Sequence, residues 1–141
     1  MSYDLVVFAP KHVPEQEEAF ASWFGQLRGS PDDFRYPDAE NCVAELRNFF
    51  AELKTYLPWQ EEQPEAACAA DYSFSRYMIR CSFPGSCQSK AYDTTLALCW
   101  RLKLGLYDIG GKGNVVYPEV AWDIIEANSK ARRPWWKFWR P

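Results

Sequence analysis

Histidine is nearly absent from this chain of 141 residues, and closely spaced metal ligands are missing. His12 is the single histidine, and no Cys-x2-Cys pair occurs among the five cysteines, which are Cys42, Cys68, Cys81, Cys87 and Cys99. The common zinc sites need such pairs or several histidines. We therefore expect no metal site and no cofactor.

Motifs for nucleophilic catalysis are missing as well. A Ser/His/Asp or Cys/His site needs a nucleophile, a base and an orienting group, and no Gly-x-Ser-x-Gly sequence accompanies His12. Residues 110–113 (Gly-Gly-Lys-Gly) lack the Gly-x4-Gly-Lys-Ser/Thr pattern of a phosphate-binding loop and are typical of a hairpin turn. The sequence therefore predicts no catalytic residue, and we expect the protein not to be an enzyme.

Export and membrane signals are not visible at the start of the chain. Residues 1–10 have no basic region, and their apolar run is too short for a signal peptide or a membrane span. The cysteines are odd in number and irregularly spaced, so they are most simply free and mostly buried thiols. Cys87 lies near a predicted helix start, which makes it the one candidate for a reactive thiolate. The cytoplasm is the compartment that these features favour.

Charge is divided unevenly along the chain. Residues 1–129 hold 11 Lys and Arg against 19 Asp and Glu, a formal charge of −8. This acidic part has the length and composition of a single globular domain, and its charge argues against nucleic-acid binding. Residues 130–141 form a basic tail with four large aromatic residues and no acid.

The tail is the most unusual segment of the sequence. Trp135, Trp136 and Trp139 have a spacing that one helical turn would bring together. Three kinds of contact fit a cationic tryptophan cluster: the acidic body of the same chain, a protein partner, or an anionic membrane surface. We expect residues 132–141 to be ordered against the body or a second copy, because burying the rings outweighs the ordering of a few residues.

Hydrophobic periodicity predicts an α+β fold with a mixed or antiparallel sheet of four to five strands and helices packed mainly on one face. A strand buried on both faces is expected at residues 3–8, and one or two strands at residues 71–83. The predicted order is β-α-α-ββ-α-ββ-α, with helices at 14–27, 43–57, 86–104 and 118–128 and the last strands at 104–109 and 114–117. Pro14, Asp38 and Ser86 are the expected helix-start residues.

Residues 59–70 contain three glutamates and Pro64, and we expect an exposed acidic connection there. Acidic runs of this kind are usually solvated, but they also form partner surfaces for cationic active sites of enzymes that handle nucleic acids or nucleotides. The predicted partner-binding residues on loops are Tyr36, Trp59, Glu61, Glu62 and Glu65, to which the three tail tryptophans are added.

Four segments, residues 2–10, 46–53, 71–75 and 104–110, resemble a widespread group of small bacterial α/β proteins that often begin with a Tyr-Asp-Leu-x-Val-Phe-Asp-Pro-like strand. These proteins are similar to the immunity proteins that accompany toxins of type VI secretion and polymorphic-toxin systems. Ala9 stands where Asp is common in the group. The resemblance spans roughly residues 2–118 and implies a non-enzymatic protein that binds and neutralises a cognate toxin.

Two other functions remain open on the sequence. One is a small-molecule-binding domain or small enzyme, with His12 and Asp108 as an acid–base pair and a pocket between sheet and helices lined by Tyr72, Tyr77, Tyr92 and Tyr107. The other is a membrane-surface adaptor that acts through the tail. The sequence indicates no oligomeric state.

Overall fold

The computed structural model describes residues 2–27, 33–110 and 113–129, apart from the side chains of residues 120–122 and 128–129. The predictions for the tail fall outside this part of the chain. Its helices and strands are β1 (Ser2–Phe8), α1 (Glu17–Gly25), α2 (Ala44–Tyr56), β2 (Asp71–Phe74), β3 (Met78–Pro84), α3 (Gln88–Leu102), β4 (Gly105–Tyr107), β5 (Val115–Val116) and α4 (Pro118–Ser129), with the short 3-10 helices η1 (Pro10–His12), η2 (Ala39–Asn41) and η3 (Gly85–Cys87).

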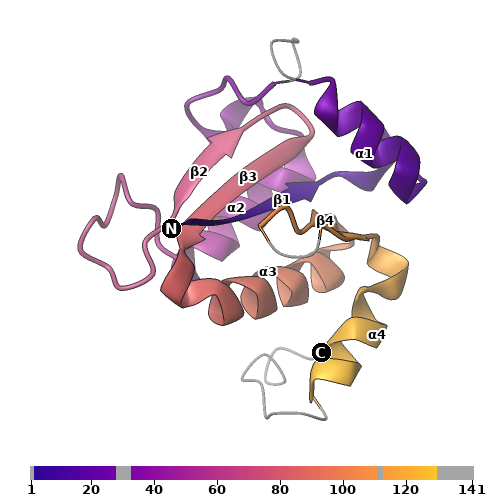
Figure 1. Cartoon of the computed structure of the whole chain (residues 1–141). Helices are drawn as coiled ribbons and strands as arrows, with labels where there is room; N and C mark the ends of the chain where they lie inside the picture. The colour runs from indigo at the N-terminus through magenta and orange to yellow at the C-terminus, as the bar shows by residue number, and fades with distance from the viewer. Residues whose placement is uncertain (1, 28–32, 111–112, 130–141) are drawn as a thin grey trace.

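The strands form one antiparallel sheet in the order β2-β3-β1-β4-β5 (Figure 1). β1 lies at its centre and pairs with β3 along its whole length, from Ser2 opposite Pro84 to Phe8 opposite Met78. The predicted α+β class and element order are confirmed. So is the burial of β1 on both faces, because no side chain from Leu5 to Phe8 is accessible to solvent.

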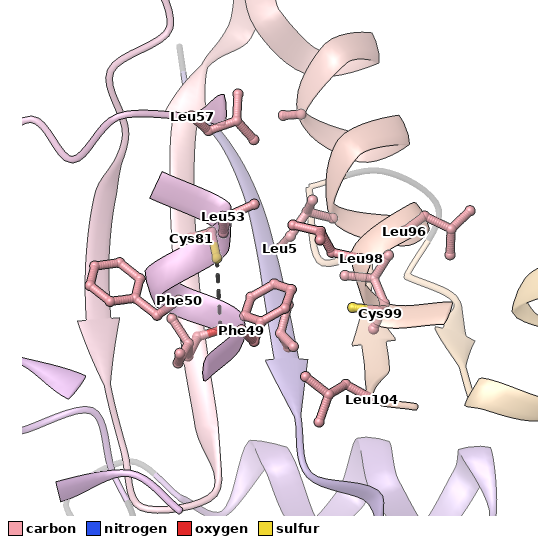
Figure 2. Packing of buried hydrophobic residues seen from close by; sticks show 14 of the residues in the cluster. Leu5, Phe49, Phe50, Leu53, Leu57, Cys81, Leu96, Leu98, Cys99 and Leu104 are labelled. Atoms are coloured by element: carbon pink, nitrogen blue, oxygen red, sulfur yellow. Dashed lines mark hydrogen bonds between the residues drawn. The ribbon is translucent and has the colours of Figure 1, made fainter. Parts of the chain in front are cut away.

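The larger core lies on one face of the sheet, beneath α2 and α3. Figure 2 shows side chains of the two helices, including Phe49 and Leu98, gathered around Leu5 of β1. α4 packs against α3, and its Ile125 joins the same core. Three of the four helices therefore cover one face, as predicted.

α1 covers only one end of the opposite face. Phe20 is fully buried there against Val6, Phe8 and Met78 in a second, smaller core. The other end of this face is polar and partly exposed, because Asp4, Arg80 and Ser82 alternate with the buried residues of β1 and β3. Arg80 Nη2 lies 2.8 Å from Asp4 Oδ2 on this uncovered surface.

The predicted helix starts are wrong by a few residues. Pro14 precedes α1, Asp38 caps the short helix η2 instead of α2, and Ser86 lies inside η3. Asp38 Oδ1 accepts a hydrogen bond from the Glu40 amide at 3.0 Å. Turns of 3-10 helix thus occupy the capping positions that sequence reasoning gave to the α-helices.

α3 ends at Lys103 and not at the predicted Gly105. Lys103 has a left-handed backbone (φ 59°, ψ 44°), and the Leu104 amide donates to the Cys99 carbonyl at 2.8 Å. Gly105 lies instead in β4 against the ring of Phe8, where an added Cβ would approach ring carbons to 2.2 Å. Two neighbouring positions therefore have different requirements, one for a left-handed backbone and the other for a missing side chain.

Replacing Lys103 by glycine should stabilise the protein by roughly 0.5–1 kcal/mol, because glycine adopts the left-handed conformation without steric cost. Urea denaturation of Lys103→Gly and Lys103→Ala would measure the effect. Alanine keeps the backbone penalty and should gain little. Equal stabilisation by both variants would show that the lysine side chain, and not its backbone, is unfavourable.

Gly110 lies close to the first strand. Its amide donates to the Asp4 carbonyl at 2.9 Å, and an added Cβ would lie 2.7 Å from the Asp4 backbone nitrogen. Gly110→Ala should therefore destabilise the fold by about 1–3 kcal/mol, since a backbone atom cannot move aside cheaply. Gly25→Ala is the matched control for thermal denaturation, because nothing lies within 4 Å of that added Cβ. If both variants melt like the parent, the contact between residue 110 and β1 is not tight.

Candidate partner-binding surface

Negative charge is concentrated in residues 33–71. This segment holds nine Asp and Glu against three Lys and Arg, a net charge of −6. It comprises the approach to α2, α2 itself and the loop before β2, so it surrounds the β2 side of the sheet (Figure 1). α1 and α4 lie toward the other side in this view. The acidic character of the body therefore belongs mainly to one side of the fold.

The acidic loop, residues 57–70, connects α2 to β2 and has a closed backbone. The Gln60 amide donates to the Ala70 carbonyl and the Ala70 amide to the Pro58 carbonyl, each at 2.8 Å. A disulfide between Cys68 and Cys87 joins the loop to the start of α3. These links hold the loop at both its base and its far end, so its charges are presented from a constrained backbone.

Glu61, Glu62 and Glu65 are exposed on this loop. Glu62 Oε2 lies 3.3 Å from Lys54 Nζ on α2, an exposed pair of the kind that contributes little to stability. Glu61 and Glu65 have no hydrogen-bond or ion-pair partner in the described part of the chain. Two of the three predicted acidic contacts are therefore available to a cationic partner without breaking an internal pair.

Tyr36 and Trp59 both lie beside Phe74 of β2. The Tyr36 amide donates to the Phe74 carbonyl at 3.1 Å, and the centroids of the Trp59 and Phe74 rings are 5.7 Å apart. Trp59 also packs edge-on against Phe50, at 5.4 Å. Both predicted residues are only partly exposed. The indole thus supports the acidic loop from within as well as bordering its surface.

The free edge of β2 is blocked at both ends. Hydrogen bonds to Pro58 and Gln60 occupy Ala70, and the bond from Tyr36 occupies the Phe74 carbonyl. An exposed edge strand invites pairing with another chain. Since only a short stretch around Tyr72 remains between the two blocked ends, this side of the fold offers side chains to a partner more readily than backbone groups.

The remaining predicted partner residues, Trp135, Trp136 and Trp139, lie outside the described residues. Their contact with the body, a second copy or a membrane stays a prediction.

His12 and Asp108 do not form the predicted acid–base pair. Asp108 Oδ1 accepts a hydrogen bond from the Tyr3 hydroxyl at 2.9 Å, near the start of β1. His12 follows the end of β1 and stacks on Tyr77, with ring centroids 4.3 Å apart. Antiparallel pairing of β1 with β4 places the residue after β4 near the beginning of β1, so the two groups lie at opposite ends of that strand.

The four tyrosines expected around a pocket are also separated. Tyr72 is buried in the larger core, where its hydroxyl donates to the Leu57 carbonyl at 2.5 Å. Tyr92 packs at the edge of that core, whereas Tyr107 packs against Phe20 on the opposite face of the sheet. The expectation that these side chains line one pocket is wrong, because the sheet stands between them.

An open cleft of about 830 Å³ lies where η1, the end of α3 and the start of α4 meet. Its lining includes Trp100 and Tyr117, with Lys11 and Lys103 opposed by two glutamates, Glu15 and Glu119. The Tyr117 hydroxyl is engaged with the Pro14 carbonyl at 3.0 Å. The mixed charges select neither an anionic nor a cationic ligand, so this cleft is a weaker functional site than the acidic loop.

The cysteines correct the expectation of free thiols throughout. Cys68 and Cys87 are joined, so Cys87 is not a reactive thiolate, while Cys42, Cys81 and Cys99 are free and buried. Burial raises the pKa of Cys42 to about 11 and raises the pKa values of Cys81 and Cys99 as well. The free thiols are therefore protonated and enclosed at neutral pH, which makes them poor nucleophiles.

Alkylation with iodoacetamide followed by mass spectrometry should count these groups. We expect little modification of the native protein at pH 8, because a buried protonated thiol reacts slowly. Denaturation without reductant should give three modified cysteines, and denaturation with reductant should give five. Five modified cysteines without reductant would contradict the Cys68–Cys87 disulfide.

Among the described residues no group of three or more His, Cys, Asp or Glu side chains could hold a metal ion. No described helix combines the length and apolar character that crossing a bilayer requires. Comparison with known protein families, curated proteins and solved structures gives no match for this chain.

Proposed function

We propose that this chain is a non-enzymatic binding protein that neutralises a cognate bacterial toxin by covering a cationic surface of that toxin. The observation that carries the proposal is the acidic loop: exposed and unpaired carboxylates on a backbone closed by hydrogen bonds and a disulfide. The resemblance of four chain segments to immunity proteins supports the same role.

The physical basis is electrostatic complementarity between two surfaces. A side of the molecule with a net charge of −6 over residues 33–71 attracts a cationic partner and repels nucleic acid. Enzymes that act on nucleic acids or nucleotides carry such cationic active sites, so a toxin of this class is the partner that the charge fits best. A constrained loop also loses less conformational entropy on binding than a flexible one.

A growth-rescue experiment tests this function. The gene immediately upstream should encode a secreted protein with a toxin-like C-terminal domain. Expressing that domain alone should arrest growth, and co-expression with this chain should restore it through a stable complex of the two proteins. A neighbouring metabolic enzyme and no co-purifying toxin would overturn the proposal. A complex that leaves the toxin fully active would also exclude neutralisation.

Membrane contact by residues 130–141 is a second candidate role, favoured by five basic residues and four large aromatic residues in that segment. Sedimentation with anionic liposomes, using the full chain and a chain ending at residue 129, separates the two roles. Tail-dependent binding to liposomes would support membrane contact, and no binding by either chain would exclude it.

The compartment is a further part of the proposal. The sequence favoured the cytoplasm, whereas disulfides persist mainly in oxidising compartments such as the bacterial periplasm. We give the disulfide more weight. Trapping thiols by alkylation during lysis of the native host, followed by fractionation, should recover an oxidised protein in the periplasmic fraction. A fully reduced protein in the cytoplasmic fraction would restore the original expectation.

A further inference from the structure

A hollow of about 430 Å³ lies between the acidic loop and the adjoining ends of the strands. Gln60 and Pro64 line it from the loop side. Asp71, Ser82 and Phe83 line it from β2 and β3. It is a polar recess with apolar walls, bordered by the loop that carries Glu61 and Glu65.

Asp71 supplies the only carboxylate in the lining of this hollow. It is the first residue of β2, is exposed, and makes no side-chain hydrogen bond or ion pair with another described residue. Asp71 lies directly opposite Ser82 in the β2–β3 register, so the carboxylate and the hydroxyl are on the same face of the sheet. A cation that enters the hollow therefore meets a charged acceptor beside a hydroxyl group.

The protein's own nearby arginine does not neutralise this carboxylate. Arg80, on the same strand as Ser82, is paired with Asp4, with Nη2 2.8 Å from Oδ2. The pair lies on the neighbouring part of the same sheet face, because Asp4 is opposite Ser82 in the β1–β3 register. Asp71 is thus left as the unpaired acid of a polar patch in which the other acid is already satisfied.

We propose that this hollow receives an arginine side chain of the protein partner. A planar guanidinium has five N–H donors, enough to bond the Asp71 carboxylate and still reach the Ser82 hydroxyl. The apolar walls formed by Pro64 and Phe83 suit the aliphatic part of the same side chain. Arginine anchors of this kind are frequent among the residues that dominate interface energies. This inference rests on the proposed function and deepens it.

A titration with a small probe tests the hollow without any toxin. Two-dimensional amide NMR spectra of the full chain would be recorded with N-acetyl-arginine amide and, separately, with N-acetyl-citrulline amide, its neutral isostere. We expect saturable shifts in the millimolar range for Gln60, Asp71 and Ser82 with the arginine probe only. Equal shifts with both probes, or shifts confined to other residues, would overturn the proposal. The Asp71→Asn variant should lose the response.

The partner itself provides the second arm of the test. Asp71→Asn should weaken toxin binding by roughly tenfold or more, since a partly enclosed charge pair is lost. Asp123→Asn, at an exposed position on α4, is the matched control and should bind like the parent. Normal binding by Asp71→Asn, with weakened binding after substitution of Glu61 and Glu65, would refute the arginine anchor but leave the proposed function standing. If no toxin binds the parent chain, the proposed function fails, while the arginine titration still reports on the hollow.

Discussion

Replacing both Cys68 and Cys87 by serine should lower the free energy of unfolding by about 3 kcal/mol, because the bond closes a loop of 19 residues in the unfolded chain. For a domain of this size the melting temperature should fall by roughly 10 °C. Urea denaturation at neutral pH would measure the change. The loop should also lose the link between its far end and α3, so affinity for the partner should fall with stability.

The parent protein in the presence of reductant is the internal control for this variant. Its denaturation curve should match that of the double serine variant, and reductant should leave the variant unchanged. If the reduced parent is as stable as the oxidised one, the Cys68–Cys87 link does not stabilise the fold. A single Cys68→Ser substitution should reproduce the double variant, which distinguishes loss of the bond from any separate role of Cys87.

Reversing the two unpaired loop charges should have the largest effect on function. Glu61→Lys combined with Glu65→Lys should weaken partner binding by roughly 100-fold, because two attractions become repulsions across the interface. Stability should change little, since both side chains are exposed and have no partner in the described structure. Isothermal titration calorimetry with the purified toxin would give the affinity, and thermal denaturation would verify folding.

The control for this experiment keeps the net charge change but moves it elsewhere. Glu18→Lys on α1 and Asp123→Lys on α4 are both exposed and lie on the elements away from the acidic loop. This variant should retain most of the affinity, with a modest reduction in association rate at low salt. Equal loss of affinity in the two double variants would mean that overall charge, and not the loop, attracts the partner.

Periodicity predicted the parts of the fold that depend on burial. The run from Leu5 to Phe8 identified a strand enclosed on both faces, and the stripe through Leu46 and Leu53 identified the face of α2 that meets the sheet. Both follow from the spacing of apolar residues along one segment. Helix starts were less predictable, because 3-10 turns replace the simple caps that single residues such as Asp38 indicate.

Features that require two distant segments were missed. The disulfide could not be chosen among five cysteines, since sequence spacing does not determine pairing. The His12–Asp108 pair failed because strand pairing puts the two groups at opposite ends of β1. Asp71 was part of a recognised strand, and only the register with Ser82 reveals that its carboxylate borders a hollow. An acid at the first position of a strand that follows an acidic loop was the signal available.

Amide hydrogen exchange of this chain, free and bound to its toxin, tests the central claim most directly. Binding should slow exchange across residues 57–71 and leave α1 and α4 unchanged, because the partner covers the acidic loop and the adjoining hollow. A truncated toxin that lacks the domain responsible for growth arrest serves as the negative control. Protection of α1 or α4 with no protection of residues 57–71 would show that the toxin binds elsewhere and would contradict the account.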